Sequence, residues 1–195
     1  MIFELFVYIF GVFICLTVLL LYKFNFIDKF IWYLYWIGFA IGLCWEVPLS
    51  IADDYSPYPP VTYLTPAPLP APFSTMAIMI SASLWDGGLF LLGILFVKLI
   101  CPSPHFTKSN KYELGVLIAY GQISELLVEL ISMSGGGWEY NVYWWNPLLF
   151  TINGNNITFL PQLIWLVAPI VYYFAIIKLK PRFSQYNQIE AKLIR

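Results

Sequence analysis

The chain has 195 residues, of which 60% are hydrophobic and only 11% are charged, and its net charge at pH 7 is −1. A soluble domain of this size cannot bury so much apolar surface, so a lipid bilayer must solvate part of the chain. The near-neutral charge excludes an electrostatic nucleic-acid interface. The three cysteines have neither disulfide nor metal-ligand spacing, so no structural metal site is expected.

Five apolar stretches are each long enough to cross a bilayer as a helix, which requires about 20 residues. They occupy residues 3–22, 30–52, 74–98, 112–133 and 158–177. The first lacks a signal-peptide cleavage site and is expected to remain as an anchor. The predicted fold class is all-α, a polytopic bundle of five transmembrane helices. Its expected units are an anchor with its loop (1–29), a four-helix domain (30–180) and a basic tail (181–195).

The charges in the connections predict the orientation of this bundle. All ten lysine and arginine residues lie in or beside the first connection, the third connection and the C-terminal tail. The second and fourth loops contain Asp53, Asp54 and Glu139 but no basic residue. By the positive-inside rule, the N-terminus is lumenal or outside and the tail is cytosolic. In a eukaryote the endoplasmic reticulum is the expected membrane.

The two outer loops have distinct compositions. The second, residues 53–73, contains seven prolines, which favours extended chain lying over the mouth of the bundle. In the fourth, the glycines at 135–137 end a helix, and the aromatic residues after them suit an interfacial belt or a lid. Trp138, Trp144 and Trp145 are interpreted as belt residues.

Acidic residues interrupt the apolar stretches. Trp45-Glu46 lies in the second and Trp85-Asp86 in the third, and the fourth carries two glutamates four residues apart. An ionisable group in hydrocarbon costs about 2.5–3.5 kcal/mol on insertion scales, so such residues usually face a cavity, a partner or a pathway. From the helical rise, we expect them in the outer half of the membrane, with Asp86 near the midplane.

A single pocket facing the outer side would satisfy these groups together. Gln122, Glu125 and Glu129 share one face of the fourth helix, and the fifth places polar and aromatic groups at a similar depth. The predicted catalytic residues are Glu46, Asp86 and Glu125. The predicted binding residues are Trp45, Trp85, Gln122, Glu129, Gln162 and Trp165.

These residue types suit chemistry on a cation. Burial favours the protonated form of a carboxylic acid, which can protonate an alkene, and a second carboxylate can deprotonate the resulting carbocation. An indole face stabilises the cation between these steps. The same residues could bind an ammonium group without reacting, or merely join neighbouring helices, and Glu129 could simply reach water. His105, the sole histidine, lies in a cytosolic turn, so a histidine triad is not expected.

The fifth stretch reads Gln-Leu-Ile-Trp-Leu-Val-Ala-Pro from Gln162, which resembles the Asn-x-x-Trp-x-x-x-Pro of emopamil-binding proteins. Gly121-Gln122-Ile123 and Leu84-Trp85-Asp86-Gly87 are similar to further motifs of that family. The resemblance covers about residues 30–180. It implies an EXPERA-type bundle around a sterol- or amine-binding cavity, as in the sterol delta-isomerase. In that case Trp165 would stabilise the cation, Gln162 would replace an amide partner, and Glu46 would be the second-span acid.

Two positions depart from this family. Gly42 stands where the family has a histidine, and Ile78 where it has an acid, so Asp86 or Glu125 would have to substitute. The Trp-Glu and Asp pattern also resembles small membrane-bound terpene cyclases, which generally have seven spans. Sterol isomerase, terpene cyclase and non-catalytic binder therefore remain open. The expected partners are a sterol or isoprenoid and membrane lipid, without nucleic acid or cofactor, and a homodimer is left open.

Overall fold

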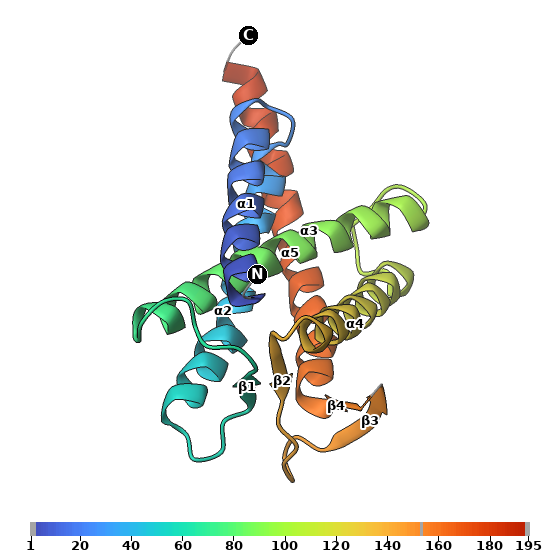
Figure 1. Ribbon diagram of the computed structural model, residues 1–195. Helices are drawn as coiled ribbons and strands as arrows, with labels where there is room; N and C mark the ends of the chain where they lie inside the picture. The colour runs from blue at the N-terminus through green and yellow to red at the C-terminus, as the bar shows by residue number, and fades with distance from the viewer. Residues whose placement is uncertain (1–2, 153, 194–195) are drawn as a thin grey trace.

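A computed structural model describes residues 3–152 and 154–193 of the chain, and its described part is built mainly from five long helices (Figure 1). All five are long and apolar enough to cross a membrane. Their bounds are α1 Phe3–Lys23, α2 Lys29–Tyr55, α3 Phe73–Ile100, α4 Lys111–Ser134 and α5 Phe159–Leu193. Side chains are described for residues 4–52, 56–152 and 154–183, so those of Asp53, Asp54, Lys192 and Arg195 lie outside the described part.

Local signals set the helix boundaries. The Asp28 side chain accepts a hydrogen bond from the Ile31 amide at 2.8 Å and starts α2, and Asn110 accepts one from the Tyr112 amide at 2.9 Å and starts α4. Gly135 ends α4. The sequence predicted a fifth apolar stretch that ends at residue 177. The helix α5 itself continues to Leu193. The loss of hydropathy after 177 marks the end of the apolar stretch, whereas the following residues contain no glycine to end the helix.

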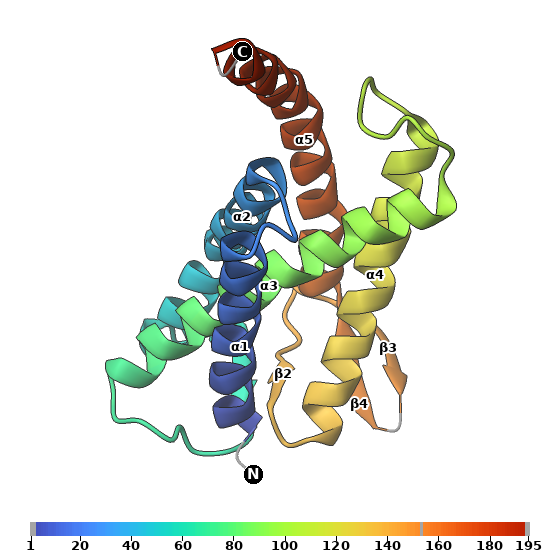
Figure 2. The ribbon, with the colours of Figure 1, turned by 90° about the horizontal axis from the view of Figure 1, so that it is seen from above.

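Helix α3 lies at the centre of the bundle, between α1 and α4 (Figure 2). Small residues allow the close approach: a Cβ atom on Gly11 would lie 2.2 Å from the Ser81 carbonyl oxygen, and one on Gly87 would lie 2.9 Å from the Tyr35 ring. The Tyr35 hydroxyl donates to the Leu84 carbonyl at 3.2 Å. The N-terminal helix is therefore packed into the bundle rather than attached as a separate anchor.

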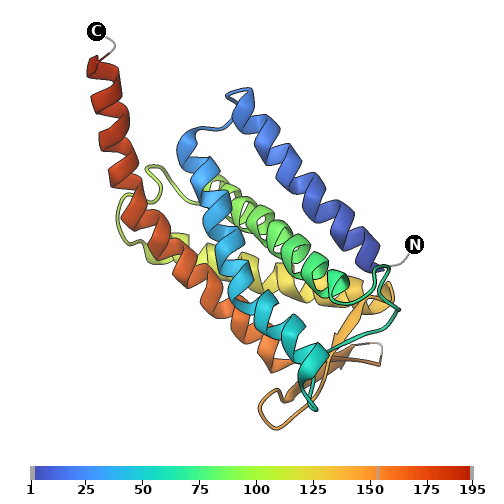
Figure 3. The same cartoon turned by 90° about the vertical axis from the view of Figure 1, so that its left-hand side faces the viewer.

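The second and fourth loops contain four short strands that the all-α prediction did not include. Strand β1 (Val61–Tyr63) pairs antiparallel with β2 (Trp138–Tyr140), and β3 (Leu148–Ile152) pairs with β4 (Asn155–Thr158). Figure 3 shows the strands at the end of the bundle opposite the C-terminus. We call the β1–β2 pair the ribbon. It joins the second loop to the fourth, because the proline-free Val-Thr-Tyr segment suits strand pairing.

Candidate functional site

Three acidic side chains from three helices line one cavity of about 50 Å³: Glu46 of α2, Asp86 of α3 and Glu125 of α4. We call it the acid cavity. The structure thus brings together the residues that the sequence predicted as catalytic. Aromatic side chains make much of the remaining wall: Trp45, Trp85, Trp138, Tyr140 and Trp165.

Gly42 makes room for one of these acids. A Cβ atom at position 42 would lie only 2.6 Å from Oδ2 of Asp86 and 3.0 Å from its Cβ. Asp86 is 7% exposed, and its Oδ2 atom has no hydrogen-bond partner among the described residues. The carboxyl of Asp86 therefore occupies the space into which any side chain at position 42 would project.

Indole rings border the carboxyls on two sides. The Trp45 Nε1 atom donates a hydrogen bond to Oε1 of Glu46 at 3.1 Å, and its ring centroid lies 5.9 Å from that of Trp165. Trp165 in turn stacks on Phe90 at 5.6 Å. On the other side, Trp85 contacts Phe10 of α1 edge to face, with the centroids 4.9 Å apart. The acids thus share their cavity with the indole rings of Trp45, Trp85 and Trp165.

The lining of the cavity is acidic. Among the described residues that line it, none is basic. Burial raises the pKa of the Tyr140 hydroxyl well above its ordinary value, and the neighbouring Glu125, Glu46 and Glu129 raise it further. Tyr140 is therefore a neutral hydroxyl that can donate a hydrogen bond to a carboxylate. Such surroundings favour a positively charged guest or intermediate.

Three predicted binding residues lie outside the cavity lining and instead join two helices. The Gln122 side-chain amide on α4 donates to the Gln162 carbonyl on α5 at 3.0 Å. The Gln162 amide donates to Oε2 of Glu129 at 3.2 Å. Glu129 is only 1% exposed, and its Oε1 atom has no hydrogen-bond partner among the described residues. Gly121 allows this contact, since a Cβ there would lie 3.0 Å from the Trp165 carbonyl oxygen.

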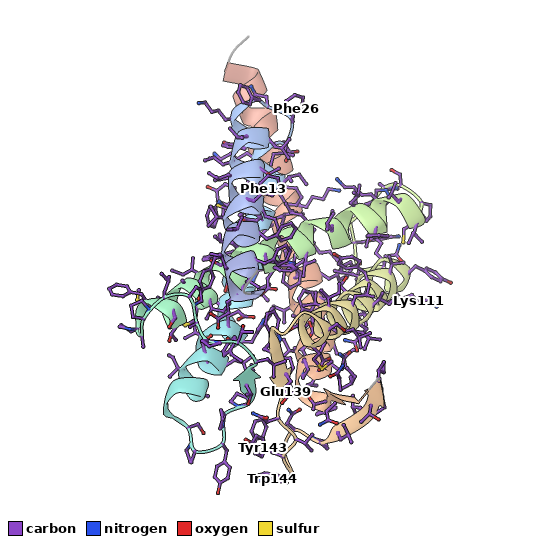
Figure 4. The ribbon with its side chains drawn as sticks, in the orientation of Figure 1. Phe13, Phe26, Lys111, Glu139, Tyr143 and Trp144 are labelled. Carbon is purple, nitrogen blue, oxygen red and sulfur yellow. The ribbon has the colours of Figure 1, made fainter. Side chains whose placement is uncertain are left out.

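Two residues of β2 were missed by sequence reasoning. Trp138 and Tyr140 line the acid cavity, so the interpretation of Trp138 as a belt residue is wrong. Ser132 at the end of α4 fixes the strand, because its Oγ accepts from the Trp138 amide at 2.8 Å and donates to its carbonyl at 3.0 Å. Side chains alternate along a strand, so Glu139 (labelled in Figure 4) is on the opposite face. Trp144 is 92% exposed.

Two larger apolar grooves flank the acid cavity. One, of about 820 Å³, runs between α1 and α3 and shares Trp85 and Leu89 with the cavity. The other, of about 340 Å³, lies between α2 and α5 and shares Trp45 and Ile164 with it. We call them the α1–α3 groove and the α2–α5 groove. Small-molecule sites usually measure about 300–1,000 Å³, so the grooves, and not the acid cavity alone, have the size for a lipid.

A separate polar cluster lies near the start of α4. Glu113 is 1% exposed and accepts hydrogen bonds from the Phe106 amide at 2.9 Å and the Tyr173 hydroxyl at 3.1 Å. The Nδ1 atom of His105 lies 3.8 Å from its Oε1. His105 thus pairs with Glu113 and not with the acids of the cavity. Within the described part of the chain, no group of three histidine, cysteine or acidic residues is arranged to hold a metal ion.

No family model, curated protein or solved structure matches the chain. The chemistry of the site follows from three features of its geometry: converging carboxyls, indole walls, and apolar grooves on both sides.

Proposed function

We propose that this protein is a multi-pass membrane enzyme that moves a double bond in, or cyclises, a sterol or other isoprenoid through a carbocation. One observation carries the proposal: Glu46, Asp86 and Glu125 line a single cavity with Trp45 and Trp165 and without a basic side chain. A cavity that only held helices together would not need three carboxyls and two indoles directed at one hollow.

The proposed reaction uses the protein's own acids and bases. One protonated carboxyl gives its proton to an alkene carbon, and the π electrons form the new C–H bond. The positive charge that remains on the neighbouring carbon faces the indole rings and the other carboxylates. A second carboxylate then removes a proton from an adjacent carbon, and the electrons of that C–H bond form the shifted double bond. Water then reprotonates the first carboxyl and accepts the proton from the second, which restores the starting state.

The closeness of Gly42 and Asp86 supports an EXPERA-like interpretation. The resemblance assigns a histidine to position 42, and in this chain the Asp86 carboxyl fills the space beside that position, 2.6 Å from where a Cβ would be. We propose that Asp86 takes over the proton-transfer role of that histidine. Glu46 and Trp165, which the resemblance names as acid and cation stabiliser, line the same cavity.

The substrate would reach the site from the bilayer. Trp85 and Leu89 separate the acid cavity from the α1–α3 groove, and Trp45 and Ile164 separate it from the α2–α5 groove. Rotation of one of these side chains would connect a lipid-filled groove to the acids. The N-terminus would face the lumen or the outside, with the tail in the cytosol. In a eukaryote the membrane would be the endoplasmic reticulum.

The enzyme proposal is tested by deuterium incorporation. Purified protein in nanodiscs is incubated in D₂O with a sterol carrying a ring double bond or with a linear prenyl alcohol. Mass spectrometry then follows the product, which should gain one deuterium at the protonated carbon. We expect Glu46→Gln and Asp86→Asn to slow turnover by about 10²–10⁴-fold, the usual contribution of a general acid or base.

Glu139→Gln is the matched control, because Glu139 lies between two lining residues but on the other face of β2. It should keep the wild-type rate. Turnover of the sterol would identify an isomerase, and cyclisation of the prenyl alcohol would identify a cyclase. Unchanged turnover in both acid variants would remove these acids from the mechanism.

The second candidate is a non-catalytic binder of cationic amphiphiles, and it is favoured by the absence of any basic side chain from the described lining. Binding of a long-chain quaternary ammonium compound would then weaken about tenfold in Glu46→Gln and in Trp165→Ala, which remove the charge and the π face. A binder would show this loss without deuterium incorporation. Binding indifferent to both substitutions would exclude it.

A further inference from the structure

A row of polar hollows leads from the ribbon end of the bundle to the acids. The outermost, of about 200 Å³, is lined by Glu4, Ser50, Ser74 and Thr75 among others, and we call it the vestibule. A second hollow of about 40 Å³ shares Tyr63 and Ile78 with the vestibule. It also shares four residues with the acid cavity: Glu46, Ala82, Trp138 and Tyr140.

Ser50 indicates what fills the vestibule. Its side chain is only 4% exposed, and its Oγ atom has no hydrogen-bond partner among the residues that the structure describes. A buried hydroxyl without a protein partner usually binds ordered water. Ser50 lies four residues after Glu46, so the two side chains share one face of α2.

The same signal recurs at the inner end of the row. Oδ2 of Asp86 is a buried polar atom without a hydrogen-bond partner in the described part of the chain. A water molecule requires a cavity of about 10–15 Å³. The hollows of about 40 and 50 Å³ therefore each have room for more than one. The whole row has room for a continuous chain of water.

We infer that water fills these three hollows and connects Glu46, Asp86 and Glu125 with the aqueous phase on the ribbon side of the membrane. The ligands of the vestibule are water and hydrated protons. The inference deepens the proposed function, since it names the compartment that exchanges protons with the acids. Its test requires no turnover, so it can fail independently of that function.

The test is thiol accessibility at Ala82, which lines the two inner hollows. Ala82→Cys is made after replacement of Cys15, Cys44 and Cys101 by serine. The protein is reconstituted in vesicles and treated with Ag⁺, a thiol-binding cation that does not cross lipid and is small enough to follow water into these hollows. Only a thiolate reacts, and thiolates form where water reaches the sulfur.

Ile80→Cys is the matched control. Ile80 is on the same helix, two residues nearer to its start, and is 46% exposed on the outer surface of the bundle, where lipid would cover it. Despite its greater depth of about 14 Å from the helix start, Ala82→Cys should react about tenfold faster than Ile80→Cys, and only with reagent on the ribbon side. Equal rates, a faster Ile80→Cys, or reaction from the other side would overturn the inference.

The second measurement uses a substitution that fills the vestibule with a larger side chain. Ser50→Leu fills the polar hollow with an apolar side chain and should slow the reaction of Ala82→Cys about tenfold, whereas Ser50→Ala should leave its rate unchanged. Both double variants are first checked for a wild-type elution profile in detergent. A rate unaffected by Ser50→Leu would show that water reaches Ala82 by another path and would contradict the proposed route.

Discussion

At Gly42 the backbone of α2 approaches α3 so closely that the carboxyl of Asp86 takes the place of a side chain. The position of the Asp86 carboxyl therefore depends on the absence of a side chain at residue 42. Sequence reasoning interpreted Gly42 as a missing histidine. In the structure, the glycine at this position leaves the space that the Asp86 carboxyl occupies.

Gly42→Ala should displace the Asp86 carboxyl, because the new Cβ would lie 2.6 Å from Oδ2. We expect a loss of stability of about 1–3 kcal/mol, as for other overpacked sites, together with a loss of any activity. Gly115→Ala is the control, since nothing lies within 4 Å of a Cβ at position 115. It should stabilise α4 by up to about 1 kcal/mol. Thermal unfolding in detergent measures both, and equal effects of the two changes would count against the steric explanation.

Tyr140 gives a prediction for alkaline pH. Burial raises the pKa of its hydroxyl in the folded state, so above a pH of about 10 the unfolded chain loses this proton while the folded chain keeps it. The free energy of unfolding should therefore fall as pH rises through this range. Tyr140→Phe should reduce the fall, while Tyr58→Phe, at a side chain that is 64% exposed, should not. Chemical unfolding at about pH 8 and 10.5 measures the difference. An alkaline loss identical in all three proteins would contradict this role.

How far the sequence predicts the site differs from residue to residue. An acid in an apolar helix is costly, so Glu46, Asp86 and Glu125 could be identified from composition and spacing alone. Gln122 and Gln162 have the same sequence signal, but Gln122 donates to the Gln162 backbone carbonyl and the Gln162 amide donates to Glu129, which joins two helices. Only the packing of α4 on α5 shows that these side chains join two helices and do not line the cavity.

At the scale of elements, the helices follow from local pattern and the ribbon does not. Apolar length predicts all five helices, to within a few residues at most ends. The register of the ribbon pairs Val61 with Tyr140 and Tyr63 with Trp138, across more than seventy residues of chain. Nothing local in either segment specifies the other. Its Asn141 anchor, which donates to Thr62 Oγ1 at 2.8 Å, is equally non-local.

A disulfide across the ribbon tests whether it opens during function. Thr62 and Glu139 are direct partners in the antiparallel pair, and such positions lie within the roughly 4.4–6.8 Å Cα separation that a disulfide accepts. If substrate enters from the bilayer, Thr62→Cys/Glu139→Cys should keep its activity within about twofold when oxidised, in a background without the native cysteines. The reduced protein is its own control. Loss of turnover on oxidation, restored by dithiothreitol, would show that substrate passes under the ribbon.

At the scale of the whole molecule, the described features divide between the two ends of the bundle. The ribbon, the vestibule and the acid cavity lie toward one end, and the His105–Glu113 pair lies near the start of α4 toward the other. Loop charge alone predicted an orientation with the N-terminus outside. The sequence also placed the acids and the second and fourth loops at one end, but it could not predict that the two loops pair as strands, because their partners are far apart in the chain.

Labelling of two exposed sites tests the orientation. Phe26, in the turn after α1, is 77% exposed, and Trp144, beyond the ribbon, is 92% exposed; Figure 4 shows them at opposite ends of the molecule. In sealed membrane vesicles with the cytosolic face outward, an impermeant thiol reagent should label Phe26→Cys and not Trp144→Cys, because the positive-inside rule places the basic first connection in the cytosol. Disruption of the membrane should make both reactive. Labelling of Trp144→Cys in these sealed vesicles would reverse the proposed topology.

The acid cavity has two apolar neighbours, reached past Trp45 on one side and past Trp85 on the other. For the proposed enzyme, whose substrate and product would both dissolve in hydrocarbon, this arrangement would provide separate routes for entry and exit. Product could leave through one groove while the next substrate molecule enters through the other, so substrate binding would not depend on product release through the same opening. Turnover would then be less prone to product inhibition than in a protein with one lateral opening.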